Sequence, residues 1–266
     1  TDAQGSLLQT NDVLDAGNTF RLSSYYNNKI NKRLTLRTGI LLQNQNLDTY
    51  VKTREGIADY DGDGRPDLFT QRDFEGAFNQ AEAFAQTQWR VAERLTLNAG
   101  LHGLYFDKTE DAAVEPRVAV NWQFSPKSTL NLGYGMHHQT QPLPVFLFRE
   151  RRPDGTAVET NTDLGFTRSQ HFVLGWDFKP AASWRVKAET YYQLLSKVPI
   201  ESTPSTFSLL NAGADFVFPE KNNLLNEGTG TNLGAELTIE KFFNQGWYSL
   251  VTVSVFDSKY KGSDGV

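Results

Sequence analysis

The sequence predicts an all-β protein, an antiparallel transmembrane β-barrel segment of about ten strands with long extracellular loops and short periplasmic turns. Three observations predict this fold. Apolar residues recur at every second position in strand-length runs, short and long connections alternate along the chain, and the tryptophans lie beside the short connections. The mean hydropathy of −0.48 is compatible with a barrel, because this average mixes lipid-facing residues with lumen-facing ones.

The composition excludes several classes of protein. The chain has 266 residues, a net charge of −5 and no cysteine, which excludes a disulfide framework, a thiolate zinc site and a cysteine nucleophile. No run of about twenty apolar residues is present for a membrane helix. Hydrolase and phosphate-loop motifs are missing, so we expect no enzyme, and the scattered basic residues give no footprint for nucleic acid.

Five pairs of strand-length runs, each pair joined by a short turn, follow one another along the chain. In the first run Phe20 and Leu22 alternate with Arg21 and Ser23, so one face is apolar and the other polar. The last run is apolar at both parities, so its faces stay unassigned. The predicted strand pairs are 20–27 with 34–43, 83–91 with 95–103, 117–124 with 130–136, 171–178 with 184–192, and 233–239 with 249–256.

The connections differ in length in a regular way. Short turns alternate with longer, polar segments that contain glycine and proline, as in outer-membrane barrels with tight periplasmic turns and long extracellular loops. No such rule sorts the loops of a soluble sandwich. The short turns lie near residues 31, 93, 126, 181 and 245, and the long segments are 48–78, 107–115, 139–167 and 200–230.

The tryptophans lie beside the short turns, and the first four have the parity of the apolar face. Because indole prefers the boundary between hydrocarbon and head groups, this pattern predicts a periplasmic aromatic girdle. The alternative is that aromatic residues favour strand ends in any β-protein. The residues are Trp89, Trp122, Trp176, Trp184 and Trp247.

Three stretches carry a resemblance to a known family, namely 116–147 (PRVAVNWQFSPKSTLNLGYGMHHQTQPLPVFL), 169–180 (SQHFVLGWDFKP) and 226–266. They resemble the barrel of TonB-dependent outer-membrane receptors of the Bacteroidetes type. The resemblance implies that residues 1–266 are part of a single outer-membrane β-barrel domain of about 22 strands, with the plug and remaining strands absent from this chain.

The resemblance also implies partners. The barrel is surrounded by outer-membrane lipid, the TonB energy complex acts through the missing plug, and the ligand is a small molecule, a glycan or a peptide. A surface lipoprotein is a further expected partner. Thr1 opens a polar run without an export signal, so any such signal was removed or lies upstream.

An aspartate-rich run in the first long loop predicts calcium binding. Carboxylates at positions 1, 3, 5 and 9 with Gly64 at position 6 match a calcium loop, although Thr70 replaces the glutamate of position 12 and no helices flank the run. Calcium loops of FG-GAP propellers are also similar, and the alternative is a solvated acidic turn. The candidate ligands are Asp59, Asp61, Asp63, Asp67 and the carbonyl of Arg65.

A second candidate site lies in the long segment 139–167, which combines aromatic and basic residues. Such side chains suit capture of a ligand at the extracellular mouth, together with residues from 200–228. The candidate ligand residues are Phe146, Phe148, Arg149, Arg151 and Arg152. His102, His137 and His171 share lumenal parity, and they are either ordinary lumenal polar residues or a weaker ligand or metal site.

Two functions remain open. The first is TonB-dependent transport of a scarce nutrient across the outer membrane, with ligand capture by extracellular loops. The alternative is a soluble calcium-binding β-protein of the propeller or adhesin type. That alternative predicts a repeated aspartate-rich loop, whereas the sequence contains one copy.

Overall fold

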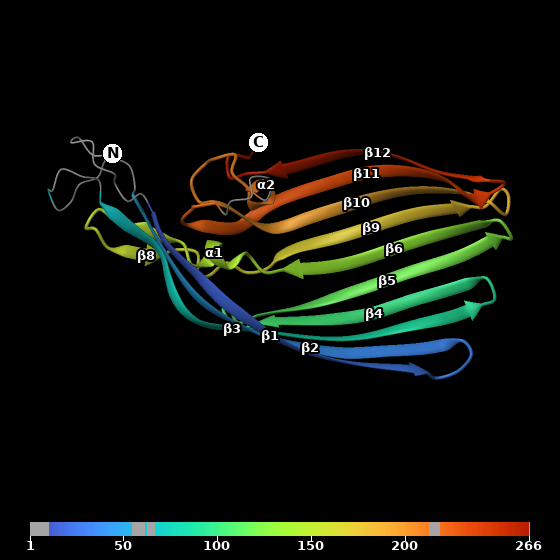
Figure 1. The fold of residues 1–266 in the computed structure, drawn as a ribbon, viewed down its shortest axis with the longest axis horizontal. Coiled ribbons are helices and arrows are strands. Elements are labelled where there is room, and N and C mark those ends of the chain that lie inside the picture. Colours follow the sequence, from blue (N-terminus) through green and yellow to red (C-terminus); the bar gives the residue numbers. More distant parts are fainter. Residues whose placement is uncertain (1–10, 55–61, 63–66, 213–218, 266) are drawn as a thin grey trace.

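A computed structural model describes residues 11–54, 62, 67–212 and 219–265, and it contains a ten-stranded antiparallel sheet (Figure 1). The strands pair in sequence order, with β7 (Arg149–Arg151) and β8 (Ala157–Glu159) forming a separate small hairpin. The sheet consists of β1 (Asn11–Lys29), β2 (Leu34–Arg54), β3 (Leu68–Ala92), β4 (Leu95–Phe106), β5 (Asp111–Ser125), β6 (Ser128–Gln139), β9 (Thr167–Phe178), β10 (Trp184–Glu201), β11 (Leu224–Asn244) and β12 (Trp247–Lys261).

The described part of the chain has two short helices, α1 (Leu143–Phe146) and α2 (Leu209–Ala212). Neither has the length and apolarity needed to cross a membrane. The all-β prediction is therefore confirmed, as is the number of strands.

The sheet is curved and its two ends differ, with short turns at one end and both helices and β8 at the other (Figure 1). All five predicted short turns are confirmed. In the first, the Asn31 side-chain oxygen accepts the backbone N–H groups of Arg33 and Leu34 at 2.8 and 3.0 Å. In the last, Gln245 and Gly246 have φ values of 56° and 87°, as a two-residue hairpin turn requires.

The predicted long connection 139–167 is confirmed, because β6 ends at Gln139 and β9 begins at Thr167, whereas the other three are shorter than predicted. The expected loop 107–115 is wrong, because β4 ends at Phe106 and β5 begins at Asp111. Similarly, β2 and β3 extend well into the expected loop 48–78, and β11 begins at Leu224. In these extensions polar residues lie on both faces of the sheet, so the sequence shows no hydrophobic alternation there. The backbone hydrogen bonds between the strands continue nevertheless.

The two faces of the sheet follow the predicted alternation. We call the face with the continuous band of exposed apolar side chains the outer face, and the opposite one the inner face. The outer residues include Ile40, Leu101, Val118, Leu132, Phe172 and Leu237. The register also assigns the two faces of β12, which the sequence left open. Val253 lies opposite Leu237 on the outer face, and Ser254 Oγ donates to Glu236 on the inner face.

The tryptophans lie where the girdle prediction places them, near the short turns. Trp122 and Trp176 both lie opposite Leu130, so they occupy one row across β5, β6 and β9. Trp184 and Trp247 contact each other edge to face at a centroid distance of 5.9 Å, with Lys241 Nζ 4.6 Å from the Trp247 ring centroid. This end of the outer face therefore carries an aromatic boundary.

Candidate functional site at the extracellular mouth

The hydrophobic core lies on the inner face, near the end with the long connections. A series of aromatic rings runs across β3 and β4 to α1, with centroid distances of 4.8 Å for Phe74–Phe78, 6.2 Å for Phe78–Phe106 and 6.2 Å for Phe106–Phe146. Phe146 is 1% exposed. The segment between β6 and β9 therefore packs on the inner face of the sheet, across the mouth of the curved structure.

Asn161 joins the two long extracellular segments. Its Nδ2 donates to the carbonyls of Val145 and Lys221 at 2.9 and 2.7 Å, and its Oδ1 accepts the N–H of Leu224 at 3.0 Å. The side chain is 1% exposed. Because a buried carboxamide is costly without partners, these three bonds fix the segment 140–166 against residues 221–224.

A cavity of about 160 Å³ lies where these segments meet β2 and β3. Its lining residues include Phe148, Pro144, Arg72 and Gln71. Arg72 Nη2 lies 3.4 Å from Asp15 Oδ2, while its buried Nε has no hydrogen-bond partner among the described residues. An aromatic ring beside a guanidinium N–H suits a ligand with an apolar part and an oxygen acceptor.

The structure separates the five predicted ligand residues. Phe146 belongs to the core, and Phe148 lines the cavity. Arg149 Nη1 lies 3.5 Å from Asp73 Oδ2, and Arg151 Nη2 lies 3.6 Å from Asp67 Oδ2. Arg152 is exposed at the turn of the β7–β8 hairpin. Arg72 was not identified from the sequence, because its part of β3 shows no alternation.

Most of the predicted calcium loop lies outside the described residues, including Asp59, Asp61, Asp63 and Arg65. Asp67 is described, and its carboxylate faces Arg151. Among the described residues no group of three or more histidine, aspartate or glutamate side chains is arranged to hold a metal ion.

The lumenal histidines belong to two neighbouring groups on the inner face. His137 and His171 lie edge to face at 6.2 Å, whereas His102 contacts Glu115 and Glu82 at 2.8 and 3.1 Å. Glu115 is 2% exposed. It was not identified from the sequence, where it lies in the expected loop 107–115.

Glu115 also bridges a gap between two strands. The β5–β6 pairing stops towards the mouth at Arg117 and Gly135, and beyond it the backbone N–H of His138 donates to Glu115 Oε1. Arg117 Nη2 donates to the other carboxylate oxygen at 2.8 Å. Glu115 therefore positions the start of the 140–166 segment.

The comparisons with known proteins agree with this architecture. The family model described as TonB dependent receptor-like, beta-barrel, matches residues 1–265. No curated protein shows a significant sequence match to the chain.

Several solved structures are similar in fold. The outer membrane transporter YddB from Escherichia coli has a TM-score of 0.65 and 12% identity, over 95% of this chain and 35% of that one. The siderophore receptor PirA from Pseudomonas aeruginosa has a TM-score of 0.66 and 11% identity, over 92% and 43%. The RagAB peptide importer has a TM-score of 0.61 and 11% identity, over 94% and 31%. The chain thus spans between 31% and 43% of the length of these proteins.

Proposed function

Because the chain belongs to the TonB-dependent receptor family of outer-membrane β-barrels, we propose that the whole protein actively transports a scarce nutrient across the outer membrane. The observation that carries this proposal is the family match over residues 1–265. A plug outside this chain couples the barrel to the TonB energy complex, and a surface lipoprotein is an additional partner. The match favours this function over a soluble calcium-binding protein.

Ligand capture takes place at the extracellular mouth, in the cavity beside Phe148 and Arg72. The support is geometric, because two long segments meet β2 and β3 there and leave an aromatic ring and a buried guanidinium N–H at one opening. The ligand is a small molecule, a glycan or a peptide with an oxygen acceptor for the guanidinium.

The transport proposal is tested by depletion of solutes from the growth medium. Cells with the full-length receptor are compared with cells that lack either the receptor or the TonB energy complex, and the solutes in each medium are measured by mass spectrometry. Transport predicts at least one solute that is depleted only when both are present. Identical depletion in all three cultures would contradict the proposal.

The cavity is tested on the solute so identified. Uptake should fall after Phe148→Ala, Arg72→Ala and deletion of residues 144–152, whereas Arg33→Ala in the periplasmic turn is the matched control. Uptake that is unchanged by the deletion removes this segment from the mechanism while leaving the transport proposal intact.

The loop at Asp59–Asp67 binds calcium, and this stiffens a long surface loop. The support is the spacing of its carboxylates, and the expected affinity is that of extracellular modules, with a dissociation constant of about 0.1 to 1 mM. Calorimetric titration of the full-length receptor should show heat of binding that Asp61→Asn abolishes and Asp163→Asn, in another loop, retains. Equal heats for the two variants would refute the site.

A further inference from the structure

The outer face changes from apolar to polar towards the extracellular ends of β1–β4. Leu22, Leu42, Ala81 and Tyr105 form one row of directly opposed residues across these strands. In the next row Asn44 lies opposite Asn79, and the N–H of Asp107 bonds to the Asn79 carbonyl at 3.1 Å. On β2–β4 one step along the strands therefore separates apolar side chains from carboxamides, whereas Phe20 on β1, opposite Asn44, is still apolar.

The polar residues form a continuous hydrogen-bonded ladder, which we call the asparagine ladder. Its members, in the order of their hydrogen bonds, are Asn18, Asn46, Asn44, Asn79 and Asp107. Asn46 Nδ2 donates to Asn18 and Asn44 at 3.0 and 2.9 Å, Asn44 Nδ2 donates to Asn79 at 2.8 Å, and Asn79 Nδ2 donates to Asp107 at 2.6 Å. Since a carboxamide offers two donors and two acceptor lone pairs, such a chain leaves hydrogen-bonding capacity for another molecule.

A hollow of about 600 Å³ lies beside the ladder on the same face. Ala16 and Ala77 leave room in it, and Asn46, Asp48 and Glu75 supply polar atoms. Asp48 and Glu75 lie directly opposite each other, and both are exposed. Two adjacent carboxylates disfavour a phosphate group but accept hydrogen bonds from hydroxyl groups.

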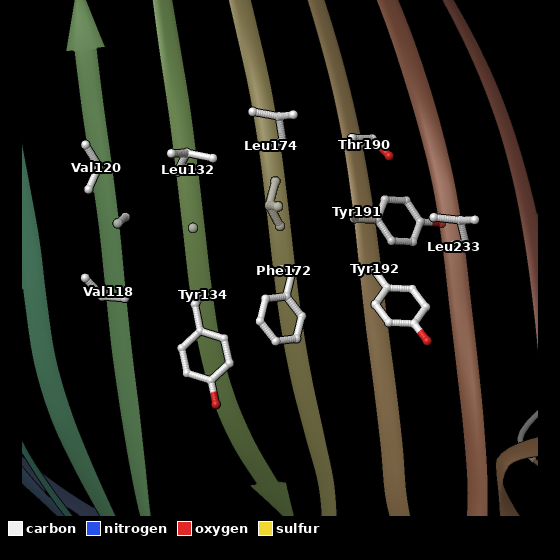
Figure 2. Close-up of a pocket in the computed structure, with 13 residues that line it drawn as sticks. Val118, Val120, Leu132, Tyr134, Phe172, Leu174, Thr190, Tyr191, Tyr192 and Leu233 are labelled. Atoms are coloured by element: carbon white, nitrogen blue, oxygen red, sulfur yellow. The ribbon is translucent and has the colours of Figure 1, made fainter.

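The ladder lies at the height of the lipid head groups. On β3, the stretch from Asn79 to Trp89 has the length of one transmembrane strand, about ten residues or about 25 Å of membrane height at the usual tilt. On β6, β9 and β10 the same outer face carries aromatic side chains at its extracellular part. Figure 2 shows Tyr134, Phe172 and Tyr192 side by side on β6, β9 and β10, and the Tyr134 hydroxyl donates to Gln170 at 3.2 Å.

We propose that the asparagine ladder and its hollow bind the uncharged sugar head group of a glycolipid in the outer leaflet. The acyl chains of this lipid lie along the apolar rows of Leu22 and Leu42, continuous with the lipid-facing band. The sugar hydroxyl groups donate to the carboxylates of Asp48 and Glu75 and to Asn46 Oδ1, since both N–H groups of Asn46 are already bonded to Asn18 and Asn44. This combination selects a sugar, because the site offers carboxamides and carboxylates but the hollow contains no basic side chain among its described lining residues.

The test uses the full-length receptor in phosphatidylcholine vesicles that contain a minor fraction of dihexosyl diacylglycerol. After mild detergent extraction, the glycolipid and phosphatidylcholine retained per receptor are counted by mass spectrometry. The receptor should retain glycolipid in excess over its fraction in the vesicle. In the variant with Asn44→Ala and Asn79→Ala this enrichment should fall about fivefold, the effect of one hydrogen bond of about 1 kcal/mol.

The inner face provides a matched control, because Asn121 Nδ2 donates to Asn131 Oδ1 at 2.6 Å on the lumenal side. Asn121→Ala combined with Asn131→Ala should leave the enrichment unchanged. Migration of unheated samples on gels verifies that each barrel is folded, and Asp48→Asn with Glu75→Gln serves as a second outer variant if the first does not fold. No enrichment by the receptor, or enrichment that survives the outer substitutions, would overturn the proposal.

Discussion

The outer face of the sheet and the inner face at its mouth are stabilised by different surroundings. On the outer face no protein side chain covers Leu132 and Val253, which are 48% and 58% exposed. Outer-membrane lipid covers these residues in place of protein. On the inner face Phe146 is 1% exposed and contacts Phe106, which lies forty positions earlier in the chain. The comparison shows that a residue of the outer face needs only to be apolar and to point towards lipid. A residue of the inner face at the mouth needs a specific side chain elsewhere in the chain to pack against.

The strongest test of the inner face is Phe146→Ala. Removing a fully buried ring typically costs about 3 to 5 kcal/mol, so the segment 140–166 should lose most of its attachment to β3 and β4. Hydrogen exchange of the full-length receptor should then show faster exchange in this segment while the amides of β9 and β10 stay protected. Phe148→Ala, at the cavity, should have a smaller effect, and equal exchange in both variants would argue against the core assignment.

A matched pair of lysine substitutions tests the difference between the faces directly. Leu132→Lys places a charge in the lipid-facing band and should cost about 2 to 4 kcal/mol, whereas Asn131→Lys, one residue earlier on the lumenal face, should cost much less. Urea unfolding of the full-length receptor in vesicles measures the loss of unfolding free energy in each variant. Equal losses of unfolding free energy would mean that the faces are wrongly assigned.

Asn161→Ala tests whether the two extracellular segments depend on one side chain. Loss of its hydrogen bonds leaves buried backbone groups unsatisfied, at about 1 to 3 kcal/mol. The backbone N–H of Leu224 donates to Asn161 Oδ1, so in the variant its hydrogen exchange should be faster by the factor that this loss of free energy implies. Asn211→Ala removes only the exposed bond to the Tyr260 hydroxyl and is the control. Unchanged exchange at Leu224 would show that Asn161 does not hold the segments together.

The smallest expected effect is a pH dependence at the end of β10, beyond the membrane band. The Ser205 hydroxyl and the Lys221 ammonium lower the pKa of Glu201 below its ordinary value of 4.5. The resulting stabilisation is present above that ordinary value and is lost as the pH falls through the lower pKa of the folded protein. It is modest, because Lys221 is 40% exposed.

This pH dependence is measured as the difference in unfolding free energy between the receptor and its Glu201→Gln variant. The difference should be largest near neutral pH and should vanish in acid below the pKa of Glu201. Added salt should reduce it, since salt screens the pair with Lys221. A difference that grows towards acid would have the wrong sign for a lowered carboxyl pKa.

The alternation of the strands was predictable, and so was much of the fold. Parity assigned Leu132, Leu174 and Trp176 to the outer face correctly, because a lipid-facing residue is specified by its own polarity and its position on the strand. The short turns were recognisable for the same local reason. The faces of β12 were not, since both parities are apolar and only the register with β11 distinguishes them.

The arrangement of the candidate site could not be predicted from the sequence, for one physical reason. The sequence placed Phe146 and Phe148 in the same segment with the same character, yet one lies in the core and the other lines a cavity with Arg72. Glu115 lay in an expected loop, although it is a buried strand residue that holds His102. Outside β12, the sequence by itself determined which residues meet lipid, because the membrane is the same partner for every outer position. Only the tertiary structure decided the arrangement of the mouth, because those side chains are held by partners far away in the chain.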